Sequence, residues 1–163
     1  MTENENFKQG ERMKTVITYG TFDLFHVGHV RLLKRLKGLG ERLVVGLSSD
    51  EFNKVKGKDV VIPFEDRKEI LLSCHFVDDV FKEESWEQKR IDIIRENANI
   101  FAMGDDWAGK FDDLKDIVDV IYLPRTKDIS TTDIKGVMKN FRSEKTDEIK
   151  NVIGHLKQLV EEL

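Results

Sequence analysis

His26 and His29, two of the chain's four histidines, lie three residues apart in the segment TYGTFDLFHVGH. If a helix begins near position 26, the two imidazoles lie on one face of its first turn. Gly28 leaves room for a ligand to approach the backbone, and a helix N-terminus attracts anions. The pair can therefore hold a phosphate and stabilise the charge that develops during transfer. The same residues also suit the ordinary capping of a helix. A metal site would need a third ligand at fixed spacing, and none is evident.

A second polar cluster is the segment RTKDISTT, from Arg125 to Thr132. It places an arginine after an apolar run and three hydroxyl side chains, Ser130, Thr131 and Thr132, before a helical pattern. Helix capping explains one or two of these hydroxyls. An arginine, several hydroxyls and a helix N-terminus together also suit a di- or triphosphate.

Three further groups have both an ordinary and a functional interpretation: the alternating lysines Lys54, Lys56 and Lys58, the carboxylates Asp105 and Asp106, and the tryptophans Trp86 and Trp107. The lysines suit either a solvated loop or a phosphate site. The carboxylates are either loop residues or a means of bringing a metal ion to phosphates. The tryptophans are more often packing residues than stacking platforms.

Alternating patterns predict the elements that position these residues. The β-branched runs predict strands at 14–22, 41–49, 77–82, 99–104 and 118–124. Helical periodicity predicts helices at 29–40, 63–74, 86–97 and 131–141. Gly40 is expected to close the first helix and Pro63 to begin the second. Ile91 and Ile94 are expected to point inward from the third.

Strands that alternate with helices indicate an α/β fold, because parallel strands require helical crossovers. We therefore expect a Rossmann-like, doubly wound parallel five-stranded sheet with helices on both faces, plus an extra C-terminal helix. Ligands bind such sheets beyond the carboxyl ends of the strands. The segments after four of the five predicted strands are polar and rich in hydrogen-bond donors, which points to a shared site at that edge.

Composition narrows the function class. The chain has 163 residues, 39% hydrophobic and 36% charged, which suits one domain with a heavily charged surface. Its net charge of −4 argues against nucleic-acid binding, and its single cysteine excludes a disulfide framework. No apolar run is long enough to span a membrane, and the polar N-terminus lacks the apolar stretch of a secretion signal. We expect a cytoplasmic protein.

The predicted organisation is a polar extension at 1–13, a main domain at 14–142 and an amphipathic helix at 143–163. In that last segment Ile149, Leu156 and Leu163 are spaced by seven, as are Val152 and Leu159. A helix of this length is marginal alone in water, so its apolar face should pack on something. It either covers its own domain or extends a homodimer contact.

Taken together, GTFDLFHVGH and RTKDISTT resemble the HxGH and RTxxISTT motifs of the cytidylyltransferase branch of the HxGH nucleotidyltransferases. WEQK at 86–89 and MGDDWAGKFD at 103–112 resemble the members of that branch that act on sn-glycerol 3-phosphate. The similarity runs in register from about Lys14 to about Phe141. One short motif is moderately specific, whereas four in order are strongly specific.

The resemblance implies a site with two parts. The residues implied to contact CTP are Thr21, Phe22, His26, Val27, Gly28, His29, Lys58, Asp106, Arg125, Thr126, Lys127, Asp128, Ile129, Ser130, Thr131 and Thr132. Among these, His26, His29, Lys58 and Arg125 would be catalytic. Lys56 and Lys89 match positions that meet the glycerol phosphate, and Asp23, Arg67 and Trp86 match supporting positions. The family usually has glycine where this chain has Asp128, and a carboxylate there would repel a triphosphate unless it points away or pairs with Lys127.

The implied reaction is transfer of CMP from CTP to sn-glycerol 3-phosphate by direct attack, giving CDP-glycerol and pyrophosphate for teichoic acid or capsule polymers. No covalent nucleophile with a neighbouring base is apparent, and an ionised phosphate needs no general base. Mg²⁺ is expected with the triphosphate, and members of the family are typically homodimers. Three alternatives stay open: another phosphorylated alcohol such as phosphoethanolamine as acceptor, ATP as the nucleotide, or a nucleotide-binding regulator without turnover.

Overall fold

The computed structural model describes residues 13–126 and 129–161, with side chains through Gln158. Lys127 and Asp128, both assigned above to the nucleotide site, lie outside the described residues. The chain divides into two compact units, Met1–Lys127 and Asp128–Leu163.

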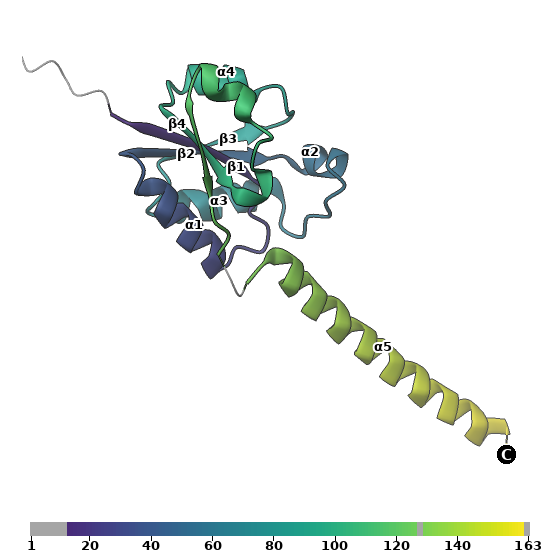
Figure 1. Cartoon of the computed structure of the whole chain (residues 1–163). Helices are drawn as coiled ribbons and strands as arrows, with labels where there is room; N and C mark the ends of the chain where they lie inside the picture. The colour runs from purple at the N-terminus through teal and green to yellow at the C-terminus, as the bar shows by residue number, and fades with distance from the viewer. Residues whose placement is uncertain (1–12, 127–128, 162–163) are drawn as a thin grey trace, which may run out of the picture. The chain divides into compact units, whose positions relative to one another are not determined.

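The first unit is built on a five-stranded, all-parallel sheet (Figure 1). Its strands are β1 (Thr15–Gly20), β2 (Arg42–Ser48), β3 (Asp79–Glu83), β4 (Ile100–Gly104) and β5 (Asp119–Leu123). Their order is β3-β2-β1-β4-β5, so the chain builds outward from β1 to one edge and then crosses back to the other side of β1. This confirms the predicted Rossmann-like α/β fold, and each observed strand lies within two residues of its predicted bounds.

One face of the sheet is covered by α1 (Val27–Lys37) and α3 (Phe64–Ser73), which lie on the same side in Figure 1. The core here joins Val16 of β1 and Val45 of β2 to Leu33 and Leu36 of α1 and Leu71 of α3. All five side chains are fully buried, as expected where both faces of a parallel sheet are covered.

The other face is covered by α4 (Lys89–Arg95) and the short 3₁₀ segment η2 (Asp112–Asp116). Ile17 and Tyr19, which alternate with the residues of the first face, pack there with Ile93, Phe101 and Leu114. The alternation of side chains along β1 thus divides the core into two clusters.

The inward direction predicted for Ile91 and Ile94 is wrong. These side chains are 68% and 66% exposed, and the buried face of α4 carries Lys89, Asp92 and Ile93 instead. Residues 89, 92 and 93 share a helical face, and the first two have buried polar partners that hold them inward. Polar interactions thus decide the rotation of this helix, which the apolar pattern alone did not reveal.

Gly40 does not close the first helix. That helix ends at Lys37, and Gly38 follows in a right-handed conformation with its N–H bonded to the Lys34 carbonyl. A Cβ on Gly40 would lie 2.5 Å from the Lys14 carbonyl oxygen, so glycine is needed there for close passage beside the start of β1. Pro63 caps α3 one position before its first helical residue.

A short helix, α2 (Asp50–Val55), follows β2 and was not predicted. Ser49 caps it by accepting a hydrogen bond from the Phe52 N–H at 3.0 Å. Its six residues are too few to show helical periodicity. A second 3₁₀ segment, η1 (Asp105–Trp107), follows β4.

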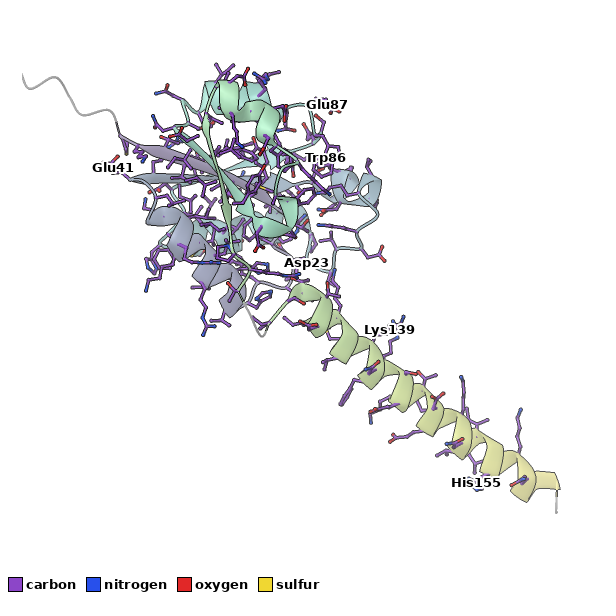
Figure 2. All side chains as sticks on the ribbon, viewed as in Figure 1. Asp23, Glu41, Trp86, Glu87, Lys139 and His155 are labelled. Carbon is purple, nitrogen blue, oxygen red and sulfur yellow. The ribbon has the colours of Figure 1, made fainter. Side chains whose placement is uncertain are left out.

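The second unit is a single helix, α5 (Thr131–Glu161), where two helices were expected. No glycine or proline interrupts residues 142–148. The Thr146 hydroxyl donates to the Arg142 carbonyl at 2.8 Å, within the helix, rather than capping a new one. Figure 2 shows side chains projecting from α5, among them Lys139 and His155. Its apolar residues Val152 and Leu156 are 58% and 57% exposed.

Among the described helices, none has the length and apolarity needed to cross a membrane.

Candidate active site

The turn that follows β1 is held in a restrained conformation. Phe22 and Leu24 both have positive φ, 49° and 48°, which is uncommon for residues other than glycine. Asp23 lies between them, 2% exposed, and its two carboxylate oxygens accept the backbone N–H groups of Val61 and Ile62, each at 2.9 Å. These bonds tie the turn to the loop before α3, and a turn held against its backbone preference is typical of a functional site.

The two histidines form the N-terminal cap of α1. The His26 Nδ1 accepts the Gly28 N–H at 3.0 Å, and the His29 Nδ1 accepts the His26 N–H at 3.3 Å. A ring nitrogen that accepts a hydrogen bond carries no proton, so the proton of each neutral imidazole resides on Nε2. The rings stack with their centroids 3.9 Å apart. The cap therefore fixes the tautomer and the orientation of both imidazoles.

The surroundings keep both histidines neutral. Burial lowers the pKa of His26, and burial together with the adjacent His26 lowers the pKa of His29 to about 4, although Asp23 opposes that change. Two stacked imidazolium rings would also repel each other. Each ring is thus a neutral Nε2–H donor at pH 7, suited to contacting phosphate oxygens without being a strong acid.

Arg67 is a structural clamp. It is 1% exposed, and its guanidinium donates to the carbonyls of Thr21, Ser48 and Ile62 and to the Asp50 carboxylate, at 2.6 to 3.0 Å. It therefore joins the carboxyl ends of β1 and β2 to the start of α2. All of these partners belong to the protein, which indicates a supporting role.

Thr21 has a partner that the sequence analysis missed. Its hydroxyl donates to the Asn53 side-chain oxygen at 2.7 Å, and the fully buried Asn53 amide donates to the carbonyls of Ser48 and Ser49. Asn53 lies on the unpredicted helix α2, so no pattern in the sequence connected it to the site.

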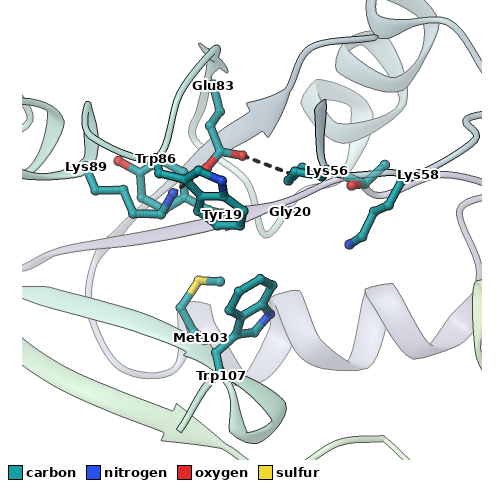
Figure 3. A pocket seen from close by; sticks show the side chains of 10 residues that line it. Tyr19, Gly20, Lys56, Lys58, Glu83, Trp86, Lys89, Met103 and Trp107 are labelled. Carbon is teal, nitrogen blue, oxygen red and sulfur yellow. Dashed lines mark hydrogen bonds and ion pairs between the residues drawn. The ribbon is translucent and has the colours of Figure 1, made fainter. Parts of the chain in front are cut away.

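A small pocket that is partly open to solvent lies at the carboxyl ends of the strands (Figure 3). Its lining comes from the ends of β1, β3 and β4, the segment after α2, and the start of α4. The lining residues are Tyr19, Gly20, Thr21, Lys56, Lys58, Glu83, Trp86, Lys89, Met103 and Trp107. With three lysines and one carboxylate, the lining carries a net positive charge suited to a phosphate ester.

Gly46 of β2 makes room for the floor of this pocket. A Cβ there would lie 2.4 Å from the Tyr19 ring, so only glycine allows the ring to rest on the neighbouring strand. The Tyr19 hydroxyl donates to the buried Asp92 carboxylate at 2.9 Å, and burial and this carboxylate raise the pKa of Tyr19. Tyr19 is therefore a neutral structural residue beneath the lysines.

Lys56 and Lys89 meet at the carboxylate of Glu83. The Lys89 ammonium is 2.5 Å from Oε1, and the Lys56 ammonium is 3.7 Å from Oε2. Ser48 donates to Oε2 at 2.5 Å and accepts from Lys56 at 2.7 Å. Burial is the main reason that the pKa of Lys56 falls to about 8, with Glu83 opposing the change and Lys58 and Lys89 reinforcing it.

Aromatic rings enclose these ammonium groups. Lys89 lies 4.4 Å from the Tyr19 ring centroid and 4.8 Å from that of Trp86, and Lys56 lies 5.6 Å from Trp86. The Trp86 and Trp107 rings are 5.5 Å apart. Both tryptophans pack with neighbouring side chains, as expected, and they also line the pocket.

Arg125 and Thr126 follow β5. Arg35 of α1 holds this segment by donating to the Pro124 carbonyl at 2.7 Å and to the Thr126 hydroxyl at 3.2 Å. Within the second unit, the Ser130 hydroxyl accepts the Asp133 N–H at 3.1 Å, which is the capping contact expected at the start of α5. Ile129, Thr131 and Thr132 belong to that same unit.

The structure thus brings many of the predicted residues to one edge of the sheet. The histidine turn, Thr21, Lys56, Lys58 and Lys89 all lie at or just beyond the carboxyl ends of the strands. Lys54 is exposed on α2 and does not line the pocket. Asp106 is exposed in η1, with a carboxylate oxygen 2.6 Å from where a Cβ on Gly104 would lie. In the described parts of the chain, no three His, Cys, Asp or Glu residues cluster as a metal site.

Comparison with known proteins shows which family this chain resembles in sequence. The profile of the family described as cytidylyltransferase-like matches residues 17–137. A glycerol-3-phosphate cytidylyltransferase from Bacillus subtilis is 58% identical over 123 residues, which are 76% of this chain and 95% of that protein. A protein of the same name from Staphylococcus aureus is 51% identical over 123 residues, 76% of this chain and 93% of its own.

Among solved structures, the chain is similar in fold to a lipopolysaccharide core biosynthesis protein from Thermoplasma volcanium. The TM-score is 0.62 at 23% identity, with 71% of this chain and all of the other covered. At that identity the likeness concerns the fold alone. The sequence relationships above are much closer, and the residues matched by the family profile include the histidine turn and the lysine pocket. This chain belongs to the cytidylyltransferase-like family.

Proposed function

We propose that this protein is a nucleotidyltransferase that transfers CMP from CTP to sn-glycerol 3-phosphate, giving CDP-glycerol and pyrophosphate. Relatives that are 51–58% identical over most of their own length carry the name of this activity. The observation that carries the assignment in this chain is the three-lysine pocket beyond the strand ends, because it supplies positive charge for a phosphate monoester.

The site favours direct in-line displacement. A phosphate oxygen of glycerol 3-phosphate attacks the α-phosphorus of CTP, a new P–O bond forms, and the bond to pyrophosphate breaks. His26 and His29 donate Nε2–H bonds to the α-phosphate, where charge develops in the transition state. Lys56 and Lys89 hold the acceptor, and Lys58 and Arg125 stabilise the departing pyrophosphate. Positioning and charge stabilisation then supply the catalysis, with no proton transfer to the nucleophile.

Mg²⁺ is proposed to enter with CTP, where it would neutralise part of the triphosphate charge. Magnesium in such sites usually keeps several waters and uses one or two carboxylates plus substrate phosphates. The donor set fits that mode, since Asp106 follows β4 as an exposed carboxylate, whereas both oxygens of Asp23 already accept backbone bonds.

The assay that tests the function pairs each of CTP and ATP with glycerol 3-phosphate or phosphoethanolamine and measures pyrophosphate release. We expect release only with CTP and glycerol 3-phosphate, and CDP-glycerol as the second product. Preferred use of phosphoethanolamine would assign a different acceptor, and CTP binding without turnover with any acceptor would indicate a regulator.

The reaction is proposed to take place in the cytoplasm, where both substrates are available. CDP-glycerol is an activated glycerol phosphate, so the reaction that consumes it must transfer that group to a growing chain. Teichoic acid or a capsule polymer is the proposed destination.

Replacing Asp128 by glycine should keep or improve CTP affinity, because it removes a carboxylate from a segment proposed to bind a triphosphate. The measurement is the Kd for CTP by calorimetry in the Asp128→Gly variant beside the unchanged protein. A conservative Asp128→Asn variant separates the charge from the backbone. A large loss of affinity in both variants would show that the carboxylate contributes to binding.

A homodimer is proposed as the working state, with α5 contributing to its contact. The family profile ends at Val137, so most of α5 lies beyond it. The apolar side chains of Ile149, Val152, Ile153 and Leu156 are about half exposed within the described unit. Burial of such side chains supplies roughly 1.5–3 kcal/mol each when complete.

A protein ending at Ser143 should therefore dimerise at least ~10-fold more weakly than the full chain, measured by sedimentation equilibrium. The matched control is the full chain with Lys150→Ala, which changes an exposed charge on the same helix. Dimers of equal strength in the full and shortened proteins would mean that α5 serves its own subunit only.

A further inference from the structure

We infer that Glu83 is a positioning residue for the acceptor: its buried carboxylate, at the end of strand β3, draws Lys56 and Lys89 together into one phosphate-binding pair. This inference rests on the proposed function. Glu83 lies outside the HxGH and RTxxISTT motifs. Its role is inferred from its contacts.

The backbone of Glu83 is firmly placed by the sheet. It is the last residue of β3, in register with Ser48 of β2, and its carbonyl accepts the Ser49 N–H at 2.9 Å. The side chain is 2% exposed. A carboxylate this buried is tolerated only when it is paired and hydrogen-bonded, and here Ser48 and both lysines satisfy it.

The two lysines come from less constrained positions. Lys56 is the residue that caps the end of the six-residue helix α2, and Lys89 is the first residue of the seven-residue helix α4. Long lysine side chains have many rotamers, so a helix end alone does not set where the ammonium lies. Glu83 lies between them and receives one ammonium on each oxygen (Figure 3).

The charged and titratable groups around the Glu83 carboxylate come from several elements. Glu83 of β3 faces Lys56, Lys89 and the exposed Lys58, and Tyr19 of β1 lies beneath with its neutral hydroxyl turned to Asp92. One carboxylate against three ammonium groups leaves excess positive charge for an incoming phosphate. At the same time, it offsets enough repulsion to keep Lys56 protonated, since Glu83 opposes the fall in the pKa of Lys56.

These contacts predict a pH signature. The pKa of Lys56 is about 8, so in the unchanged protein the affinity for glycerol 3-phosphate should fall as pH rises through that value and the ammonium is lost. Removing the charge of Glu83 lowers the pKa of Lys56 further, by about one unit for a counter-charge at this distance. The fall in affinity should then begin near neutral pH.

The test uses Glu83→Gln, which keeps the shape and removes the charge, in the full chain. Binding of glycerol 3-phosphate is followed by tryptophan fluorescence, because Trp86 lies beside Lys89. At pH 7.5 we expect the Kd and the KM for glycerol 3-phosphate to rise about tenfold, the value of one charge-assisted contact, while the KM for CTP changes less than about twofold. The pH midpoint of acceptor binding should move down by about one unit.

Two further variants separate the charge of Glu83 from its shape and position. Glu83→Asp retains the charge and should restore the pH midpoint even where affinity is reduced. Glu84→Gln, at an exposed neighbour that pairs with Lys82, should change neither constant. Equal loss of CTP and acceptor affinity in Glu83→Gln, or an unshifted midpoint, would overturn the positioning role. A wild-type protein that binds glycerol 3-phosphate without forming CDP-glycerol would instead overturn the proposed function, and the binding test of Glu83 would still stand.

Discussion

Replacing His29 by alanine should lower kcat by ~10²-fold or more while leaving the KM for both substrates within a few-fold. The His29 ring is a neutral Nε2–H donor, held in place because its Nδ1 accepts the His26 N–H. A donor aimed at charge that grows in the transition state contributes to kcat more than to ground-state binding. Steady-state kinetics with both substrates varied measures the effect.

The fold should survive this change, because the bond that His29 contributes to the cap is long at 3.3 Å and worth at most about 2 kcal/mol. Thermal unfolding of the variant checks this directly. His75→Ala removes an exposed imidazole from outside the pocket lining and serves as the matched control. A kcat near normal in His29→Ala would exclude the transition-state role.

Replacing Lys89 should weaken the binding of the acceptor, glycerol 3-phosphate. We expect Lys89→Met to raise the KM for glycerol 3-phosphate by about 10- to 100-fold, the value of one charge-assisted hydrogen bond, with a much smaller change for CTP. Methionine retains the length of the buried stem against Tyr19 and Trp86, so the loss concerns the ammonium. The two KM values, determined at saturating co-substrate, give the comparison.

This variant also leaves Glu83 without its nearer partner. Breaking a buried ion pair costs about 3–5 kcal/mol, so thermal stability should fall in Lys89→Met and recover in the Lys89→Met, Glu83→Gln double variant. The double variant should remain poor in acceptor KM, which separates stability from binding. Lys82→Met, at a half-exposed lysine on β3, controls for loss of a charge. Equal rises in both KM values would show that Lys89 does not belong to the acceptor site.

Much of the fold could be predicted because its strands are short apolar runs bounded by polar turns. β1 and β2 illustrate this, since nearly every residue in each is buried and the pattern needs no knowledge of partners. The rotation of α4 could not be predicted in the same way. Its buried face includes Lys89 and Asp92, and their partners Glu83 and Tyr19 come from strands β3 and β1.

The residues of the candidate site also fall into two groups: those that a local sequence pattern could predict and those that depend on distant partners. His26 and His29 could be proposed from local spacing, because the two imidazoles and the helix start lie in one short segment, whereas the role of Lys56 was implied only by the family resemblance. Glu83 and Asn53 could not, since each acts through residues distant in sequence. One signal for Glu83 was available: two lysines proposed to converge on one phosphate require a nearby counter-charge when they are buried.

At position 26, the residue that would best stabilise the start of α1 differs from the residue that the proposed activity needs. Serine, aspartate and asparagine are the strongest N-terminal caps of helices, and histidine is not among them. The chain nevertheless uses the His26 ring to accept the Gly28 N–H, which places the ring proton on the opposite nitrogen. A variant selected only for heat resistance would gain from a better cap here and would lose the proposed phosphate donor in the same step. The start of α1 therefore marks a place where engineering for stability and engineering for turnover must diverge.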